Sequence, residues 1–442
     1  MKNNQVSRRY FLMGTAAAMG GAAFAAAPAR RSVSPNEKLN IAGIGIGGRG
    51  AGDIGEVSGE NIVALCDVDD AYAARVYDTY PKAQRYRDYR VMLEKQKDID
   101  AVVIGTPDHL HAVITMAAIQ LGKHVYCEKP LTHSVYEARM IAKAAHEANV
   151  ATQMGNQGQA GEEARILAEL IWDGAIGNVQ EIHGWSNRFP RICRRGMPRP
   201  EGSTPVPDTL DWDLWLGPAQ ERPYVAGAYN PFVWRGWWDF GTGVLGDIGC
   251  HNFSAIVKTL KLGPPSSVEA TSTAVQDPPE IRNESTPIAS IVRYQFPAIG
   301  DRPAVTLAWY DGGMMPPRPD ELEPGREMGG GDGMLYIGDK GKLLNHRVIP
   351  ETRMKEIGKP PQVLPRSPGH HAEWINACKG GDPAGSNFDF AGPLTETVLL
   401  GNIAIRTGKK LLWDSENLTI TNHPEANAYI NPPYREGWSL GV

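Results

Sequence analysis

The sequence predicts an α/β protein of two domains: a doubly wound parallel sheet, then an α+β domain with a large, mostly antiparallel open sheet. Between residues 41 and 154, apolar runs alternate with helical patterns, which is typical of parallel strands joined by crossover helices. Beyond residue 155, strand patterns follow one another with few helices between them, which favours antiparallel pairing with one open face. A glycine-rich turn after the first strand of the first domain indicates nucleotide binding.

Two registers of Gly-x-Gly-x-x-Gly fit this turn, Gly43-Gly45-Gly48 and Gly45-Gly47-Gly50. We prefer the second, because the first leaves a strand of only four residues before the turn. An apolar run that enters this motif and leads into a helix is the phosphate-binding fingerprint of a Rossmann domain. Gly45 is then expected to make the tight turn, Gly47 to let the backbone approach the pyrophosphate, and Gly50 to let the helix pack closely on the strand. The pyrophosphate would lie on free backbone N–H groups at the helix start.

An acidic residue, Asp67, follows the second apolar run, residues 62–66, where the fingerprint needs a partner for the adenosine ribose. Its carboxylate can accept hydrogen bonds from the ribose hydroxyls and would repel a 2′-phosphate, so NAD is the expected cofactor. Arg49 in the turn leaves NADP open as the alternative. Glycine motifs also occur in plain structural turns, but here a strand, a helix and an acid surround the motif.

Length and charge limit the classes of function. A chain of 442 residues is long enough for two or three domains, and its apolar content of 42% is ordinary for a folded domain. The formal net charge of −5 gives no general attraction to nucleic acid or to an anionic membrane, so we expect a small-molecule partner. Five scattered cysteines without a Cys-x-x-Cys pair argue against a disulfide framework and a structural zinc site, and no metal is expected.

The first 29 residues have the pattern of an export signal. Paired arginines, Arg8 and Arg9, precede an Ala/Gly-rich run that ends in Ala-x-Ala sequences around Ala27, an order typical of a twin-arginine signal peptide. An ordinary secretion signal or an uncleaved anchor fits less well, because Ala and Gly make a poor membrane span. The twin-arginine route carries folded proteins. We therefore expect a periplasmic or other extracytoplasmic protein, free of the membrane after cleavage, whose cofactor is loaded before export.

Two motifs follow consecutive strand patterns of the first domain: residues 106–112 read TPDHLHA and residues 127–131 read CEKPL. Together they resemble the motifs of the glucose-fructose oxidoreductase, inositol dehydrogenase and MocA (Gfo/Idh/MocA) family, and the resemblance extends over nearly the whole mature chain. It implies that the nicotinamide side of the cofactor is lined by Thr106, His109, Glu128 and Lys129. For His111 we expect a solvent-exposed place at a helix start.

The residues expected to contact the cofactor are Gly45, Gly47, Gly48, Arg49, Gly50, Asp67, Thr106, Pro107, His109, Glu128, Lys129 and Gln157. The expected domains are a signal peptide at residues 1–29, a nucleotide-binding domain at 36–154, a substrate-binding and oligomerisation domain at 155–415 and a C-terminal arm at 416–442. The family uses its second domain to cover the substrate and to associate subunits, so the resemblance implies a homo-oligomer.

A glycine-rich stretch, residues 241–251, contains Asp247 and His251. Residues four apart share one face of a helix, so both side chains can reach the same hydroxyl. Such a pair is more often a solvated contact or a helix cap, but the family carries Asp-x-x-x-His on its catalytic helix, with a lysine partner that matches Lys129. The resemblance therefore implies that Lys129, Asp247 and His251 are catalytic. His251 would be the base, oriented by Asp247, because imidazole titrates near neutral pH, and Lys129 would stabilise the alkoxide and relay the proton.

The segment from 188 to 238 is rich in Arg, Pro and Trp. Flat aromatic faces and hydrogen-bonding side chains suit a sugar, whose ring has apolar C–H faces and polar edges. Arg188 and Trp237, together with His251, are the expected substrate contacts. The alternative for any single tryptophan is that it fills the core or a subunit interface.

Three functions fit these features. The leading one is an NAD(P)-dependent oxidoreductase that oxidises or reduces a ring hydroxyl of a sugar or glycoside, with the 3-hydroxyl as one candidate. No freely exchanging NAD pool is expected outside the cytoplasm, so its cofactor would be tightly bound and recycled internally. The second is a redox-neutral NAD-dependent glycosidase of the same superfamily, like the alpha-N-acetylgalactosaminidases, against which the intact Glu128-Lys129-Pro130 speaks weakly. The third is a non-catalytic sugar-binding protein, which the intact Lys129, Asp247 and His251 disfavour.

Overall fold

The computed structural model describes residues 34, 36–188 and 195–441, and the expected signal peptide lies outside them. The first domain is a six-stranded parallel sheet with the order β3-β2-β1-β4-β5-β6, which confirms the predicted doubly wound sheet. Its strands are β1 (Asn40–Ile44), β2 (Asn61–Cys66), β3 (Gln84–Tyr86), β4 (Ala101–Ile104), β5 (His124–Glu128) and β6 (Thr152–Gly155). The strand order reverses between β1 and β4, where doubly wound sheets bind their ligands at the carboxyl ends of the strands.

Helices join these strands and cover the two faces of the sheet. They are α1 (Gly48–Glu56), α2 (Asp70–Thr79), α3 (Tyr89–Lys95), α4 (Asp108–Gln120) and α5 (Val135–Ala148). Buried side chains of α3, α4 and α5 belong to one apolar cluster, and those of α1 and α2 belong to another. The start of α5 is set by its sequence, because Ser134 and Glu137 form a capping box in which each side chain accepts from the other's backbone N–H.

The second domain is built on a nine-stranded sheet, which confirms the predicted large open sheet. The strand order is β13-β12-β11-β7-β10-β9-β8-β14-β15, and all neighbouring pairs are antiparallel except β7 with β10. Its strands are β7 (Val179–Ser186), β8 (Ser267–Ser272), β9 (Ser290–Phe296), β10 (Val305–Asp311), β11 (Asp332–Gly338), β12 (Lys342–Leu344), β13 (Arg347–Ile349), β14 (Leu411–Asp414) and β15 (Thr419–Ile420). In β9, buried and less buried residues alternate, as expected for a strand whose two faces differ in cover.

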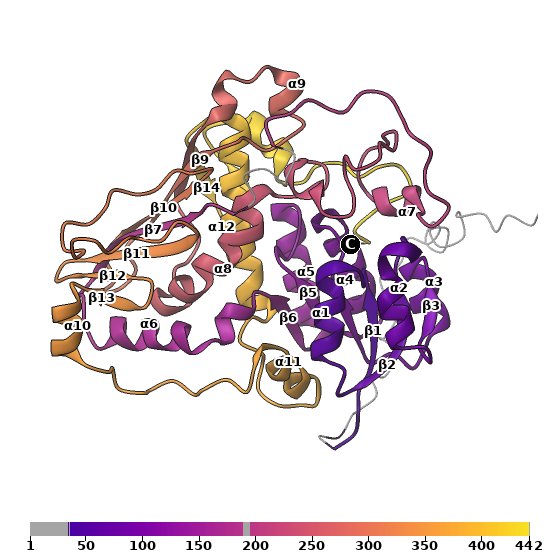
Figure 1. Ribbon diagram of the computed structural model, residues 1–442, viewed down its shortest axis with the longest axis horizontal. Coiled ribbons are helices and arrows are strands. Elements are labelled where there is room, and N and C mark those ends of the chain that lie inside the picture. Colours follow the sequence, from indigo (N-terminus) through magenta and orange to yellow (C-terminus); the bar gives the residue numbers. More distant parts are fainter. Residues whose placement is uncertain (1–33, 35, 189–194, 442) are drawn as a thin grey trace, which may run out of the picture.

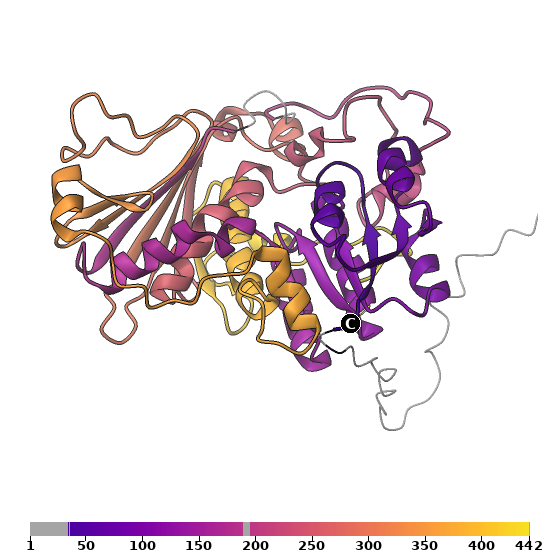
Figure 2. The ribbon, with the colours of Figure 1, turned by 60° about the horizontal axis from the view of Figure 1, so that its bottom comes forward.

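Long helices pack on one face of this sheet and join it to the first domain. Figures 1 and 2 show α8 (Gly243–Leu260) and α12 (Phe388–Thr407) between the two sheets, with α6 (Glu162–Trp172) beside them. Helix α12 contacts α5 of the first domain as well as β8 and β9 of the second. One apolar cluster contains buried residues of both domains. This shared core fixes the position of the second domain relative to the nucleotide-binding edge of the first. The other helices are α9 (Pro279–Arg282), α10 (Glu351–Ile357) and α11 (His370–Cys378).

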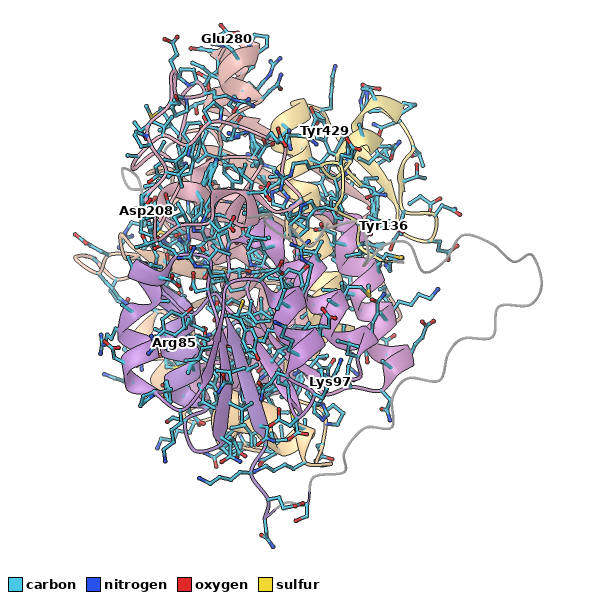
Figure 3. The ribbon with its side chains drawn as sticks, turned by 90° about the vertical axis from the view of Figure 1, so that its right-hand side faces the viewer. Arg85, Lys97, Tyr136, Asp208, Glu280 and Tyr429 are labelled. Atoms are coloured by element: carbon cyan, nitrogen blue, oxygen red, sulfur yellow. The ribbon has the colours of Figure 1, made fainter. Side chains whose placement is uncertain are left out.

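Two irregular segments cover the carboxyl-end edge of the Rossmann sheet. The first, residues 195–240, contains α7 (Trp212–Leu216) and the 3-10 turn η3 (Val233–Gly236) and pairs with the loop after β2 through an Asp69–Leu210 bridge. The second is the C-terminal arm, in which Ile430 O accepts from Tyr136 N at the start of α5 (3.0 Å). Figure 1 shows the C terminus beside α4, and Figure 3 shows Tyr429 and Tyr136 on one side of the molecule.

Cys66, Cys127, Cys250 and Cys378 are buried and form no disulfide with one another, and Cys193 lies outside the described residues. Among those residues, no group of three or more His, Cys, Asp and Glu is arranged to hold a metal ion. No helix within 34–188 or 195–441 combines the length and the apolar character that a membrane span needs.

Candidate functional site

A pocket of about 340 Å³ lies at the carboxyl ends of the Rossmann strands, under the two irregular segments. At one end it is lined by Glu128 and Lys129, which end and follow β5. It crosses the glycine-rich turn after β1 and reaches Asp88 and Tyr89, which follow β3. The pocket therefore spans the sheet from β5 to β3, the direction in which a Rossmann domain binds a dinucleotide.

The structure places the tight turn at Gly45, directly after β1. Gly45 has a φ of +71°, and a Cβ there would lie 2.6 Å from the backbone nitrogen of Thr106. A Cβ on Gly50 would lie 2.0 Å from the carbonyl oxygen of Gly45, so α1 packs against the turn only because Gly50 has no side chain.

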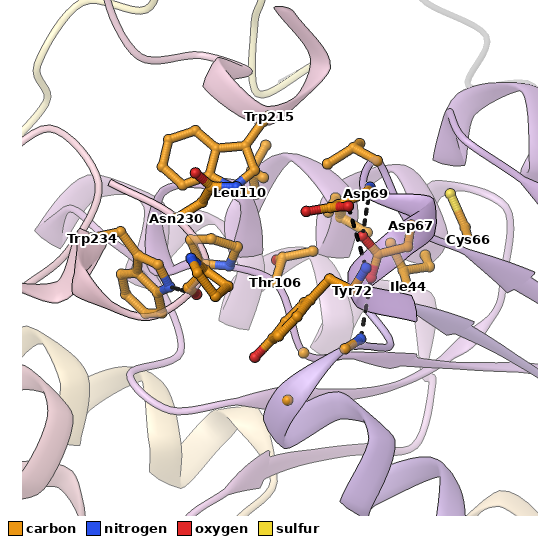
Figure 4. A pocket seen from close by; sticks show the side chains of 18 of the residues that line it. Ile44, Cys66, Asp67, Asp69, Tyr72, Thr106, Leu110, Trp215, Asn230 and Trp234 are labelled. Carbon is orange, nitrogen blue, oxygen red and sulfur yellow. Dashed lines mark hydrogen bonds between the residues drawn. The ribbon is translucent and has the colours of Figure 1, made fainter. Parts of the chain in front are cut away.

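The start of α1 is arranged to receive an anion. Its N-cap, Gly47, provides no side-chain cap, and the first turn has no acidic residue. Uncapped N–H groups at a helix start bind phosphate, so the turn fits the pyrophosphate of a dinucleotide. Tyr72 of α2 lies over this turn, because a Cβ on Gly47 would come within 2.0 Å of its ring and one on Gly48 within 2.3 Å of its hydroxyl. Figure 4 shows Tyr72 reaching across the pocket, a position that our sequence analysis did not predict.

Asp67 lies at the same turn, after β2. Its Oδ2 accepts from the backbone N–H groups of Ile46 (2.8 Å) and Gly47 (3.2 Å). Figure 4 shows this carboxylate with its hydrogen bonds in the pocket wall. Burial raises the pKa of Asp67 to about 6, although three backbone N–H groups oppose the shift. A carboxylate here can hold the hydroxyls of the adenosine ribose, so the residue fits the predicted place.

Arg49 does not face Asp67 but is bound by two other carboxylates. Its Nε lies 3.1 Å from Glu128 Oε1, and its NH2 group lies 2.5 Å from Asp53 Oδ1. Glu128 Oε1 also accepts from Gln157 Nε2 (2.7 Å), which places Gln157 behind the pocket wall. Burial raises the pKa of Asp53 to about 6, with Arg49 opposing. Because Glu128 and Asp53 hold its guanidinium, Arg49 is poorly placed to receive a 2′-phosphate beside Asp67, which favours NAD over NADP.

The two domains meet at Lys129 and Asp247. Lys129 Nζ donates to Asp247 Oδ1 (2.6 Å), and Arg235 Nε of η3 donates to the same oxygen (3.1 Å). Burial alone would raise the pKa of Asp247, but Lys129 and Arg235 hold it well below its ordinary value. Burial opposes the charge on Lys129, yet Asp247 and then Glu128 raise the pKa of Lys129 above its ordinary value. Two cations therefore share one carboxylate, and the cluster carries a net positive charge.

His251 lies one helical turn beyond Asp247 on α8 and is partly buried. Burial, followed by the nearby charge of Lys129, lowers the pKa of His251 to about 3. Asp247 raises it too little to compensate, and among the described residues the hydrogen-bond partners of Asp247 are Lys129 and Arg235. The expectation that Asp247 orients an imidazole titrating near neutral pH is therefore corrected: His251 is neutral, and Asp247 serves the two cations.

The remaining predicted residues divide between the pocket and the core. Thr106 and Pro107 line the pocket, but His109 does not, because its ring nitrogens face the carbonyl oxygens of Trp215 (3.0 Å) and Phe240 (3.3 Å). The expectation of an exposed His111 is wrong, since its ring is buried against the carbonyl oxygens of Pro130 (2.7 Å) and Thr106 (2.9 Å).

Trp237 and Arg188, the two expected substrate contacts in the Arg/Trp-rich segment, lie in different surroundings. Trp237 is completely buried in an aromatic cluster and donates to Ala228 O (2.8 Å), so it is a core residue and not a sugar contact. Arg188 is exposed, pairs with Asp332 (2.5 Å), and acts electrostatically on His251. Sequence reasoning missed Arg235, although it lies among the tryptophans of this segment, six residues before Gly241.

Comparisons with known proteins agree with this architecture. Residues 38–156 match the Gfo/Idh/MocA family model described as an oxidoreductase family, NAD-binding Rossmann fold, and residues 172–282 match the model of the family's C-terminal alpha/beta domain. Inositol 2-dehydrogenase of Salmonella typhimurium is 30% identical over 130 residues, which are 29% of this chain and 38% of that protein. Glycosyl hydrolase family 109 protein 1 of Akkermansia muciniphila is 26% identical over 155 residues, 32% of each chain.

The fold is also similar to that of a solved structure, the WlbA dehydrogenase from Bordetella pertussis in complex with NADH and UDP-GlcNAcA. The TM-score is 0.59 at 16% identity, over 86% of this chain and 99% of the other. The sequence matches to the curated relatives span less than two fifths of their length. Because the two models of one family match parts of both domains and together more than half of the chain, the protein belongs to the Gfo/Idh/MocA oxidoreductase family, and its first domain is the NAD-binding Rossmann fold of that family.

Proposed function

We propose that this protein is an NAD-dependent oxidoreductase that transfers a hydride between its cofactor and a ring hydroxyl of a sugar or glycoside, with the 3-hydroxyl of a glycoside as the first to test. The observation that carries the proposal is the 2.6 Å contact between Lys129 of the nucleotide domain and Asp247 of the sheet domain. Lys129 also lines the pocket, so a polar cluster from both domains meets the end of the pocket that begins at β5.

Bound NAD would supply the hydride acceptor, and the side chains would manage the proton and the developing charge. The hydride leaves from the C–H of the reacting carbon. When the hydroxyl on that carbon gives up its proton, its oxygen gains the negative character of an alkoxide, which needs a preorganised cation. Lys129 provides this cation, because Asp247 and Glu128 keep its ammonium charged. Arg235 adds a second positive charge to the same carboxylate, so Lys129, Arg235 and Asp247 together carry a net charge of +1 that can stabilise an alkoxide.

The hydroxyl proton needs an acceptor close to this cluster. His251 fits that role because its imidazole is neutral and has a free lone pair to accept the proton. Its low proton affinity in the empty site would rise when an alkoxide forms beside it, since a nearby negative charge stabilises the imidazolium. Arg188, whose charge acts on His251, is the residue of the Arg/Trp-rich segment that we propose contacts the remainder of the substrate.

The proposal includes export by the twin-arginine route, followed by work in the periplasm or another extracytoplasmic space. Arg8 and Arg9, which support it, lie outside the described residues. A protein that works there keeps its NAD bound and regenerates it within each cycle or with a second sugar. We also propose a homo-oligomer, by analogy with the family's use of the second domain. Replacement of Arg8 and Arg9 by lysine should retain the protein in the cytoplasm, and unchanged export would contradict the route.

A second function is favoured by one specific observation, the similarity to Glycosyl hydrolase family 109 protein 1 of Akkermansia muciniphila. In this alternative the sugar is oxidised transiently, the aglycone is eliminated, water is added and the sugar is reduced again. The same cation cluster would stabilise the transient alkoxide, so the geometry of Lys129 and Asp247 suits both reactions.

One experiment separates these functions. Purified protein is incubated with a panel of glycosides while nicotinamide absorbance and aglycone release are followed together. Net reduction of NAD or formation of a keto sugar supports the oxidoreductase. Free aglycone without net redox change supports the glycosidase, and neither signal, despite NAD binding, would overturn both in favour of a sugar-binding protein.

A further inference from the structure

The pocket has a definite polarity, because two of its residues mark opposite parts of a dinucleotide. Asp67 marks the adenosine ribose, and Lys129 marks the reacting end. Beyond Asp67 the pocket continues past β2 toward the sheet edge, where Asp88 and Tyr89 line it. The adenine of NAD therefore belongs in this part of the pocket. Its outer wall includes Trp438, a residue of the C-terminal arm.

The arm is tied to the roof of the pocket by one buried arginine. Arg435 donates from its side chain to Asp213 Oδ1 (2.8 Å) and to Gly217 O (3.0 Å), and from its backbone to Pro218 O (2.9 Å). Only 8% of Arg435 is exposed. Asp213 belongs to α7, whose residues Leu214 and Trp215 line the pocket. The arm and the roof therefore form one unit.

The arm is also tied to the Rossmann domain, at Trp438 and in the residues that follow it. The guanidinium of Arg90 lies 4.7 Å from the centre of the Trp438 ring, and Arg90 is itself fixed by Asp88 (2.7 Å). After Trp438, Leu440 is buried, and Gly441 O accepts from Gln120 Nε2 of α4 (2.6 Å). A stacked cation and buried flanking contacts hold the indole in place, which a loosely attached tail would not achieve.

We propose that Trp438, positioned by Arg435, closes the adenine end of the pocket and keeps NAD bound from one turnover to the next. The inference rests on the proposed NAD-dependent function and assigns its cofactor retention to the C-terminal arm. Retention follows because a dinucleotide leaving past the adenine end must first displace an arm that is fixed to α7, α3 and α4. Removing the wall should act mainly on the rate of cofactor release, since affinity changes within one site appear mostly in dissociation.

The test compares Trp438→Ala and Arg435→Met with two matched controls in the exported form of the chain. Trp172→Ala removes a half-exposed tryptophan from α6 of the second domain, and Ser439→Ala changes an exposed neighbour of Trp438. Each protein is loaded with NADH, and its release into excess NAD is followed by fluorescence. Nucleotide content is also measured after gel filtration, and circular dichroism and melting temperature show whether each variant is folded. Trp438→Phe keeps an aromatic wall if Trp438→Ala does not fold.

We expect NADH to leave Trp438→Ala and Arg435→Met at least about tenfold faster than it leaves the unchanged protein. Trp172→Ala and Ser439→Ala should release it at the original rate, and Trp438→Phe should be intermediate. ADP-ribose, which lacks nicotinamide, should lose affinity for Trp438→Ala by the same factor as NADH. Unchanged release from folded Trp438 and Arg435 variants would overturn the role of the arm while leaving the proposed function intact. Failure of the unchanged protein to bind any dinucleotide would instead overturn the proposed function.

Discussion

Lys129 Nζ and Asp247 Oδ1 lie 2.6 Å apart, although 118 residues separate them in the chain. One residue follows a strand of the Rossmann sheet, and the other lies on the helix that packs under the second sheet. Their contact exists only when the two domains are packed together. The proposed chemistry is therefore a property of the interface between domains, and it predicts specific effects of changing either side.

Replacing Lys129 by alanine should lower turnover by about a thousandfold, because the developing alkoxide loses its nearest ammonium. Binding of NAD should change by about twofold or less, since the pyrophosphate and ribose contacts belong to the glycine turn and Asp67. Steady-state kinetics and NADH titration measure the two effects. Lys143→Ala, an exposed change on α5, serves as the control. Full turnover by Lys129→Ala would rule out its catalytic role.

His251→Asn should also lower turnover by orders of magnitude while leaving NAD binding nearly unchanged, because asparagine cannot take up the hydroxyl proton. The pKa of His251 is lowered to about 3 by burial and Lys129. The unchanged enzyme should therefore show no loss of kcat/KM between pH 8 and about 5 that depends on His251. His146→Asn, at an exposed position of α5, should behave like the unchanged protein. An acid limb near pH 6.5 that disappears in His251→Asn would contradict the low pKa.

Asp247 and Arg235 should move the ionisation of Lys129 in opposite directions. Asp247 raises the pKa of Lys129, and Arg235 lowers it. In Asp247→Asn the ammonium loses its strongest anionic neighbour and keeps Glu128 and Arg235, so its pKa falls and the alkaline limb of kcat/KM moves to lower pH. Adding Arg235→Met to that variant should move the alkaline limb back to higher pH. Asp173→Asn, a change at an exposed position, should leave the pH profile unchanged. If adding Arg235→Met moved the alkaline limb further in the direction caused by Asp247→Asn, the shared-carboxylate arrangement would be refuted.

Strong local patterns made most of the fold predictable from the sequence. The strands and helices of the Rossmann domain follow from periodicity, and the turn at Gly45 follows from glycine spacing, because both depend on residues close in the chain. The burial of His111 and Trp237 could not be predicted from such local patterns. Whether such a residue is exposed depends on which distant segment covers it, and here residues 195–240 fold over α4.

The same limit applies to Arg235 and Trp438. Arg235 belongs to the site because it donates to the same oxygen of Asp247 as Lys129 does, and the lysine is more than one hundred residues away in the chain. Trp438 borders the pocket because the C-terminal arm returns to the Rossmann domain, and no short motif marks that return. Local patterns therefore locate the backbone of a nucleotide site, whereas the side chains supplied from other segments appear only in three dimensions.

The ionisation of Asp67 should make the stability of the empty protein and its affinity for NAD depend on pH in opposite directions. Its pKa is raised from 3.8 to about 6 by burial, so the empty folded protein binds this proton more tightly than the unfolded chain does. The contribution of protonated Asp67 to stability is therefore complete below pH 3.8 and is lost as pH rises through about 6. NAD binding needs the ionised form, because only the carboxylate accepts hydrogen bonds from both ribose hydroxyls, so affinity should fall as pH drops below about 6.

The variant Asp67→Asn separates these effects. It removes a buried charge, so the melting temperature of the empty protein at pH 7.5 should rise or stay unchanged, while NAD affinity should fall about tenfold. Affinity for NADP should fall less, because the repulsion of the 2′-phosphate is lost together with the ribose contact. Differential scanning fluorimetry and NADH titration from pH 5 to 8 measure the effects, with the exposed Asp78→Asn as control. If NAD affinity of Asp67→Asn kept the pH dependence of the unchanged protein, the ionisation below pH 7 would belong to another group, with Asp53 as the next residue to replace because burial raises its pKa to about 6 as well.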